Sequence, residues 1–104
     1  MLVVELAKWG SMIGLQEAGR KVFSPDFDPE AANARDPEVQ TILHFNELIG
    51  TLVKNNLIDR ELVYDWLYVK GPWERVGPAA RRLREEVGVP MMFENFEALA
   101  EGQG

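Results

Sequence analysis

The chain has 104 residues, a length that fits a single domain. Apolar residues make up 46% and charged residues 27%, close to soluble globular proteins, so one hydrophobic core suffices. The absence of cysteine excludes disulfides, thiolate zinc sites, iron–sulfur clusters and cysteine nucleophiles. A net charge of -6 argues against non-specific binding to nucleic acid or anionic membranes. No secretory signal is recognisable, and we therefore expect a cytoplasmic protein.

Apolar residues recur at helical spacing over residues 2–23, which predicts a first helix. Gly10 and Gly14 lower its intrinsic helix propensity by about 1 kcal/mol each relative to alanine. Either another helix approaches closely at these glycines, or the helix breaks near them. The sequence Gly10-Ser11-Met12-Ile13-Gly14 also has the small-residue spacing that lets two helices cross closely, within one chain or between subunits.

Two Asp-Pro-Glu sequences predict helix starts, with Asp as the N-cap and Pro in the first helical position. The first follows Phe27 in a connector, residues 24–36, and predicts a short helix over residues 29–34. The second predicts a long helix over residues 37–55. The apolar face of the long helix is broad, which indicates a central helix with several neighbours. Gly50 lies within it and indicates close packing.

Three further helices are predicted in the second half of the chain. Asn55-Asn56 is expected to end the long helix, and Asp59 to cap a third over residues 60–69. A fourth runs from residue 72 or 73 to residue 87, where Gly88 ends it. Gly77-Pro78 is expected to kink or restart this fourth helix.

A short C-terminal helix is predicted after Pro90, and residues 101–104 are expected to fray. No segment alternates convincingly as a strand. The sequence therefore predicts an all-α fold, a compact bundle of about five helices in a single domain over residues 1–104. The expected aromatic core residues are Phe45, Trp66, Trp73, Phe93 and Phe96.

His44 is the only histidine, and Glu47 lies one turn further along the predicted long helix. The pair predicts either two metal ligands or an acid/base couple. A metal site would need further ligands from other helices, because the chain has no Glu-x-x-His pair of the di-iron type. The simpler interpretation is a partly exposed histidine beside a solvated glutamate. We expect no cofactor and no resident metal, with His44 and Glu47 as the only weak candidates.

Acidic residues alternate at Asp26, Asp28 and Glu30, the spacing with which a calcium-binding loop begins. The remaining requirements fail, because Ala31 replaces the glycine of the sharp turn and Pro37 replaces the bidentate glutamate. We therefore interpret this segment as a solvated acidic loop.

A basic cluster on the predicted fourth helix raises the possibility of a phosphate or nucleic-acid site. It comprises Arg75, Arg81, Arg82 and Arg84. Arg81 and Glu85, and likewise Arg82 and Glu86, are spaced for ion pairs within the helix. The sequence therefore favours a salt-bridged, solvated face.

Residues 52–59 resemble the helix–turn–helix of winged-helix DNA-binding proteins. The helix that would read DNA carries Asp59, Glu61 and Asp65, however, and phosphates repel such a helix. No wing hairpin follows. We expect no binding to nucleic acid.

Short motifs follow one another from Phe45 onward. They are Phe45-Asn46-Glu47-Leu48, Leu57-Ile58-Asp59, Leu62-Val63-Tyr64-Asp65-Trp66-Leu67, Trp73-Glu74, Arg84-Glu85-Glu86 and Phe93-Glu94-Asn95-Phe96-Glu97. In this order they resemble an uncharacterised family of short bacterial helical proteins, a domain of unknown function. Some members of that family carry an N-terminal membrane helix, and this sequence departs from that pattern. We expect no role in a membrane.

The resemblance implies the helical fold and supplies no catalytic residue. It points to a recurring set, which we interpret as helix caps and buried polar anchors. The set is Glu47, Asp59, Asp65, Trp73, Glu94 and Asn95. The leading hypothesis is a non-enzymatic helical module that binds a protein partner or itself. The alternatives are a metal-dependent or acid/base enzyme that uses His44 and Glu47, and a helical domain that binds nucleic acid.

Overall fold

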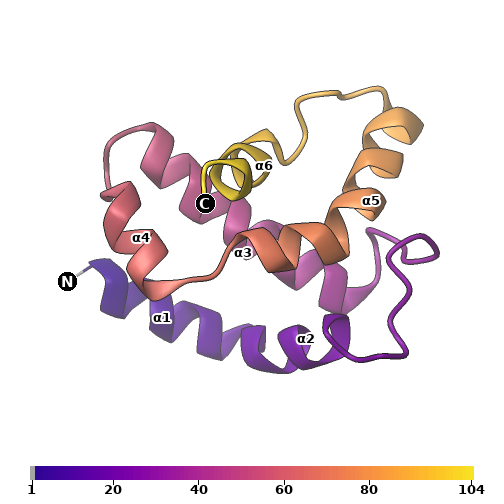
Figure 1. The fold of residues 1–104 in the computed structure, drawn as a ribbon, viewed down its shortest axis with the longest axis horizontal. Helices are drawn as coiled ribbons and strands as arrows, with labels where there is room; N and C mark the ends of the chain where they lie inside the picture. The colour runs from indigo at the N-terminus through magenta and orange to yellow at the C-terminus, as the bar shows by residue number, and fades with distance from the viewer. Residues whose placement is uncertain (1) are drawn as a thin grey trace.

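The computed structural model describes residues 2–104, which fold into six α-helices and contain no strand. The helices are α1 (Leu2–Met12), α2 (Leu15–Val22), α3 (Pro37–Lys54), α4 (Arg60–Trp66), α5 (Lys70–Val87) and α6 (Glu94–Glu101). Figure 1 shows α1 and α2 end to end along one edge of the molecule, with α3 crossing behind α5 and α6. The predicted all-α fold is confirmed. No helix within these residues is both long and apolar enough to span a membrane.

The predicted first helix is broken into α1 and α2, which confirms the expected break near its glycines. Gly14 adopts the left-handed conformation, with φ of 78°, and separates the two helices. Gly10 is buried, and a Cβ atom there would lie 3.1 Å from the ring of Phe45 and 3.1 Å from Leu15. The break turns the predicted five helices into six.

Helix α3 is the centre of the fold, as its broad apolar face predicts, and it forms close pairs with α2, α5 and α6. It ends at Lys54, one residue before the predicted end. Asn56 then takes the left-handed conformation, with φ of 61°, and the Leu57 amide donates to the Leu52 carbonyl at 2.9 Å. This bond satisfies a carbonyl of the last helical turn.

The prediction of a short helix over residues 29–34 is wrong, because polar side chains there form turns instead. The Asp28 carboxylate accepts from the Glu30 amide at 3.0 Å, and the Asn33 side chain accepts from the Arg35 amide at 2.8 Å. Such local bonds compete with helical backbone bonds. Asp36 is the residue before α3, as predicted, but its carboxylate accepts from the Asn33 amide and makes no capping bond to α3.

The boundary between the third and fourth predicted helices is also displaced. Helix α4 ends at Trp66, and Leu67 is extended, whereas the sequence predicted a helix to residue 69. Helix α5 begins two residues before Pro72, because proline is compatible with the first helical turn. Pro78 lies inside α5, and Figure 1 shows that α5 changes direction midway, which confirms the predicted kink.

Residues 101–103 are bonded to the rest of the fold, contrary to the predicted frayed tail. Glu101 completes α6, and the Gln103 side chain makes three hydrogen bonds to the segment between α4 and α5. The prediction failed because the partners of Gln103 lie 33 to 36 residues away in the sequence, where no local pattern indicates them.

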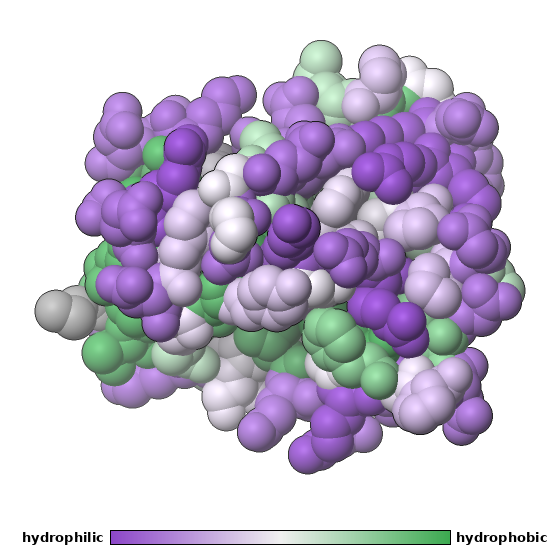
Figure 2. All heavy atoms as spheres, in the orientation of Figure 1, coloured by the Kyte–Doolittle hydropathy of each residue, from purple (hydrophilic) through white to green (hydrophobic). Residues whose placement is uncertain are grey.

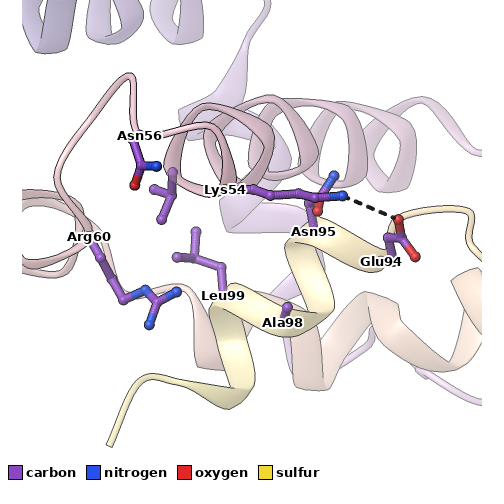
Figure 3. A pocket seen from close by; sticks show the side chains of 9 residues that line it. Lys54, Asn56, Arg60, Glu94, Asn95, Ala98 and Leu99 are labelled. Atoms are coloured by element: carbon purple, nitrogen blue, oxygen red, sulfur yellow. Dashed lines mark ion pairs between the residues drawn. The ribbon is translucent and has the colours of Figure 1, made fainter.

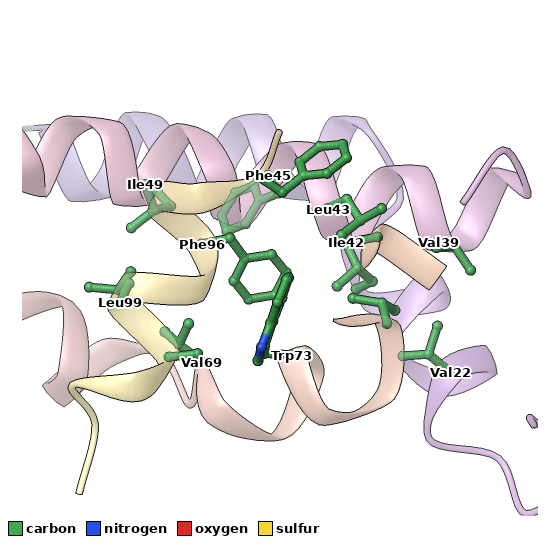
Figure 4. Packing of buried hydrophobic residues seen from close by; sticks show 14 of the residues in the cluster. Val22, Val39, Ile42, Leu43, Phe45, Ile49, Val69, Trp73, Phe96 and Leu99 are labelled. Carbon is green, nitrogen blue, oxygen red and sulfur yellow. The ribbon is translucent and has the colours of Figure 1, made fainter. Parts of the chain in front are cut away.

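The hydrophobic core lies where α3, α5 and α6 meet. Phe96 is fully buried, and its ring meets Trp73 edge-on, with 4.9 Å between the ring centroids (Figure 4). Trp9 of α1 stacks on Phe45 at 5.3 Å and joins the first helix to this core. The predicted aromatic residues are buried except Trp66, which is half-buried and meets Phe45 edge-on at 6.3 Å.

Candidate functional site

His44 and Glu47 lie one turn apart on α3, but they have different surroundings. The His44 side chain is exposed and meets Phe93 edge-on, with 5.4 Å between ring centroids. The Glu47 carboxylate is half-buried and contacts the first turn of α6. Within residues 2–104, no three acidic or histidine side chains gather closely enough to hold a metal ion. The hypothesis of a metal site at His44 and Glu47 therefore has no set of ligands within residues 2–104.

Glu47 caps α6 from the neighbouring helix. Its Oε1 accepts from the Phe96 amide at 2.9 Å, and its Oε2 accepts from Asn95 Nδ2 at 2.9 Å. Asn95 Nδ2 also donates to Thr51 Oγ1 at 3.2 Å. The residue before α6, Phe93, is in the left-handed conformation and has no side-chain acceptor to offer. Glu47 therefore supplies both the acceptor and the negative charge that a helix N-terminus favours.

The other residues of the recurring set are dispersed. Trp73 is buried in the core, whereas Asp59 and Asp65 are exposed. Asp59 is the residue before α4, as predicted, but its side chain makes no capping bond. The interpretation as helix caps and polar anchors therefore holds for Glu47 and Asn95, whereas Trp73 is an apolar core residue and Glu94 is exposed.

A cavity of about 580 Å³ lies between the end of α3, the start of α4 and α6. Figure 3 shows Lys54 extended toward Glu94, with Arg60 at the other end of the cavity. Lys54 Nζ and the Glu94 carboxylate are 4.0 Å apart. Asp59 and Glu61 flank Arg60 and line a neighbouring cavity. The three carboxylates outnumber the two cations, so this surface does not select an anion.

The arginine cluster fastens the connector rather than forming a free basic patch. Arg75 donates to the carbonyls of Val22, Ser24 and Phe27 at 2.7 to 3.2 Å. Arg82 donates to the Pro29 and Ala32 carbonyls. The two guanidinium groups thus hold the backbone of residues 22–32 against α5.

The remaining two arginines bind a shared acidic partner on α6. Arg84 Nη1 lies 2.8 Å and Arg81 Nη2 3.4 Å from the Glu97 carboxylate. Both guanidinium groups also lie over the Trp73 ring. The predicted pairs Arg81–Glu85 and Arg82–Glu86 do not form, because tertiary partners replace the neighbours along α5. Arg82 instead lies 3.8 Å from the Glu30 carboxylate.

The acidic loop and the helix–turn–helix segment do not form the sites that their patterns resemble. The Asp28 carboxylate accepts a hydrogen bond within its own turn, and the Glu30 carboxylate pairs with Arg82. Helix α4 presents Glu61 and Asp65 to solvent, and no wing hairpin occurs within residues 2–104. Neither segment offers a ligand-binding geometry in the described structure.

An apolar groove of about 480 Å³ lies between α1, α2 and α4. Ala7, Gly10, Ser11 and Gly14 form its wall on the α1 side. Its other apolar lining comes from Leu15, Phe45, Trp66 and Leu67. At its rim, the hydrogen bond from Arg20 holds the pKa of the Glu17 carboxyl below its ordinary value. The sequence flagged the glycine pattern on α1 but not the α4 residues, since no local signal places α4 beside α1.

Comparison with protein families matches residues 7–103 to a domain of unknown function, DUF4760. This match confirms the resemblance to an uncharacterised family that the motifs after Phe45 indicate. Neither the comparison with curated proteins nor the comparison with solved structures finds a match. The chain therefore belongs to the DUF4760 family, whose shared domain has an unknown function.

Proposed function

We propose that this domain is a non-enzymatic module that associates with a second copy of itself through α1. The observation that carries the proposal is an exposed seam formed by Val4, Ala7 and Ser11 on this helix and by Gly14 just beyond its end. The helical residues Val4, Ala7 and Ser11 are spaced three and four residues apart, the spacing with which two helices pack along a shared seam. The side chains are small or apolar, so a second helix backbone can approach closely.

The seam is complementary to itself. Val4 is 49% exposed at one end, and at the other end Ser11 and Gly14 line the apolar groove. If two α1 helices pair in opposite directions about a two-fold axis, Val4 of one copy lies level with Ser11 of the other. Each valine then covers the groove of the partner, as an isologous interface requires. The burial of apolar surface would drive the association.

The surface around the seam supports this choice of partner. Leu2 and Met12 on α1 are 41% and 84% exposed, and Leu62 on α4 is 43% exposed. Figure 2 shows apolar side chains gathered over α1 and α4 on a face that is otherwise mainly polar. At the rim, Glu17 and Arg20 pair with each other, so the groove does not demand a charged partner.

Sedimentation analysis of the purified chain tests the proposal. We expect a concentration-dependent dimer for the natural sequence and a monomer for Ala7→Glu, since a carboxylate in the seam would be buried without a partner. Ala98→Glu is the matched control, because Ala98 is exposed on α6, away from the seam, and this variant should still dimerise. A natural chain that stays monomeric at its highest soluble concentration would refute the proposal.

The natural chain has no cysteine, which permits a direct test of the direction of pairing. In a chain carrying both Val4→Cys and Ser11→Cys, the two positions on one helix are about 10 Å apart along the axis. They are too distant for a disulfide within the chain. Antiparallel pairing predicts rapid oxidation to a covalent dimer, whereas Val4→Cys alone should cross-link slowly. Equal rates for both variants would contradict the pairing.

A further inference from the structure

Helix α4, which forms one wall of the groove, is the helix least held by its neighbours. The close helix pairs are α2–α3, α3–α6, α5–α6, α1–α2, α3–α5 and α2–α5, and α4 belongs to none of them. It has only seven residues, too few to be stable alone. Apart from Val63, which is fully buried, its position depends on long-range side-chain contacts.

Gln103 provides the most complete of these contacts. Its Oε1 accepts from the amides of Val69 and Lys70 at 2.7 and 3.0 Å, and its Nε2 donates to the Leu67 carbonyl at 3.0 Å. The backbone between α4 and α5 thus presents two donors and one acceptor to one carboxamide group. A primary carboxamide, with one oxygen and one NH2 group, matches this arrangement on both sides.

The bonds of Gln103 bear directly on the groove. Leu67 lines the groove and accepts the Nε2 bond, and Trp66, which precedes it, also lines the groove. A second contact holds α4 to α6, because the Tyr64 hydroxyl donates to the Leu99 carbonyl at 2.7 Å. Both contacts come from α6 or from the residues that follow it.

We propose that residues 67–70 form a carboxamide-binding site, filled within the chain by Gln103, and that Gln103 latches the α4 wall of the groove. The expected effect of this latch on dimerisation rests on the self-association proposed above, whereas the hydrogen bonds of Gln103 do not. When Gln103 leaves the site, the amides of Val69 and Lys70 and the Leu67 carbonyl lose their partner, and Trp66 keeps only its packing against Phe45 and the core. The groove then loses the wall that a second copy would contact.

Hydrogen exchange tests the latch independently of association. We expect Gln103→Ala to accelerate exchange of the Val69 and Lys70 amides at least tenfold and to broaden the indole NMR signal of Trp66. Gln40→Ala is the matched control, because Gln40 is exposed on α3 with no side-chain hydrogen bond in the described structure. Exchange rates of Val69 and Lys70 within twofold of this control would overturn the proposal.

A second variant separates the two halves of the site. Gln103→Glu keeps an oxygen for the two amides but replaces the donor to Leu67 with an acceptor. We expect Val69 and Lys70 to stay protected in this variant while the Trp66 signal broadens. An unchanged Trp66 signal would show that the Leu67 bond does not hold the wall.

The dimer dissociation constant supplies the functional readout. Gln103→Ala is expected to raise this constant at least tenfold, although no residue of α1 is changed. If the natural chain does not dimerise, self-association fails and the exchange experiment still decides the latch. If the natural chain and Gln103→Ala have the same dimer dissociation constant, the latch does not control the groove.

Discussion

Replacing Gly50 by alanine tests the closest approach of two helices in this fold. A Cβ atom at Gly50 would lie 2.5 Å from the Asn95 carbonyl oxygen, which is backbone and cannot rotate away. Helices α3 and α6 would have to separate by roughly 0.9 Å to reach ordinary contact at 3.4 Å. This separation would also stretch the bond between Glu47 Oε1 and the Phe96 amide, now 2.9 Å. Overpacking costs about 1–3 kcal/mol, and a weakened cap about 1 kcal/mol.

Against this cost, alanine gains about 1 kcal/mol in helix propensity over glycine. The net expectation for Gly50→Ala is therefore a loss of about 2 kcal/mol in the free energy of unfolding. Gly19→Ala on α2 is the control, since a Cβ atom there meets nothing within 4 Å. It should gain about 1 kcal/mol, so the two variants should differ by about 3 kcal/mol.

Thermal denaturation followed by circular dichroism measures both variants under the same conditions. For a domain of this size, a difference of about 3 kcal/mol corresponds to roughly 12–24 °C between the two unfolding midpoints. If Gly50→Ala is as stable as Gly19→Ala, then the α3–α6 contact is not the tight contact described here, and the reasoning fails.

Two other substitutions address the contacts of α6. Glu47→Ala should lower the free energy of unfolding by about 2 kcal/mol, and Glu47→Gln by about half as much, because the amide oxygen still accepts from Phe96. Urea denaturation should show no comparable loss for the exposed Glu61→Ala, and equal values for all three variants would exclude a capping role. Burial raises the pKa of the Tyr64 hydroxyl above its ordinary value. The resulting stabilisation is fully present below about pH 10 and is lost as the pH rises through the folded-state pKa. Denaturation as a function of pH should show this loss in the natural chain and a smaller one in Tyr64→Phe; identical profiles would contradict it.

The sequence predicted α3 and the kink in α5 well, because their signals are local. Pro37 and the Asn55-Asn56 pair mark the ends of α3, and the broad apolar face between them indicates a central position. Pro78 has no backbone N–H, so one helical hydrogen bond is lost there whatever the helix packs against. Gly50 was correctly identified as a site of close packing, although the sequence did not name Asn95 as the partner.

Predictions that depended on a choice between partners failed. Arg82 has Glu86 one turn away on α5. It instead binds the connector at the Pro29 carbonyl, 53 residues away in the sequence. The single turns at Asp28 and Asn33 replaced the predicted helix over residues 29–34, since their side chains bond the local backbone and Arg82 occupies the carbonyls. Local spacing ranks neighbours along one helix but carries no information on donors that folding brings from elsewhere.

The sequence by itself therefore determined the all-α class, the central helix, the aromatic core and the membership of an uncharacterised family. These follow from apolar periodicity, from glycine and proline, and from motif order, all of which act over short distances along the chain. Only the tertiary structure decided that Glu47 caps α6, that Gln103 fastens residues 67–70, and that α1 and α4 enclose a groove. Each of these pairs residues from different helices or linkers, and the geometry of such pairs is fixed only when the core packs.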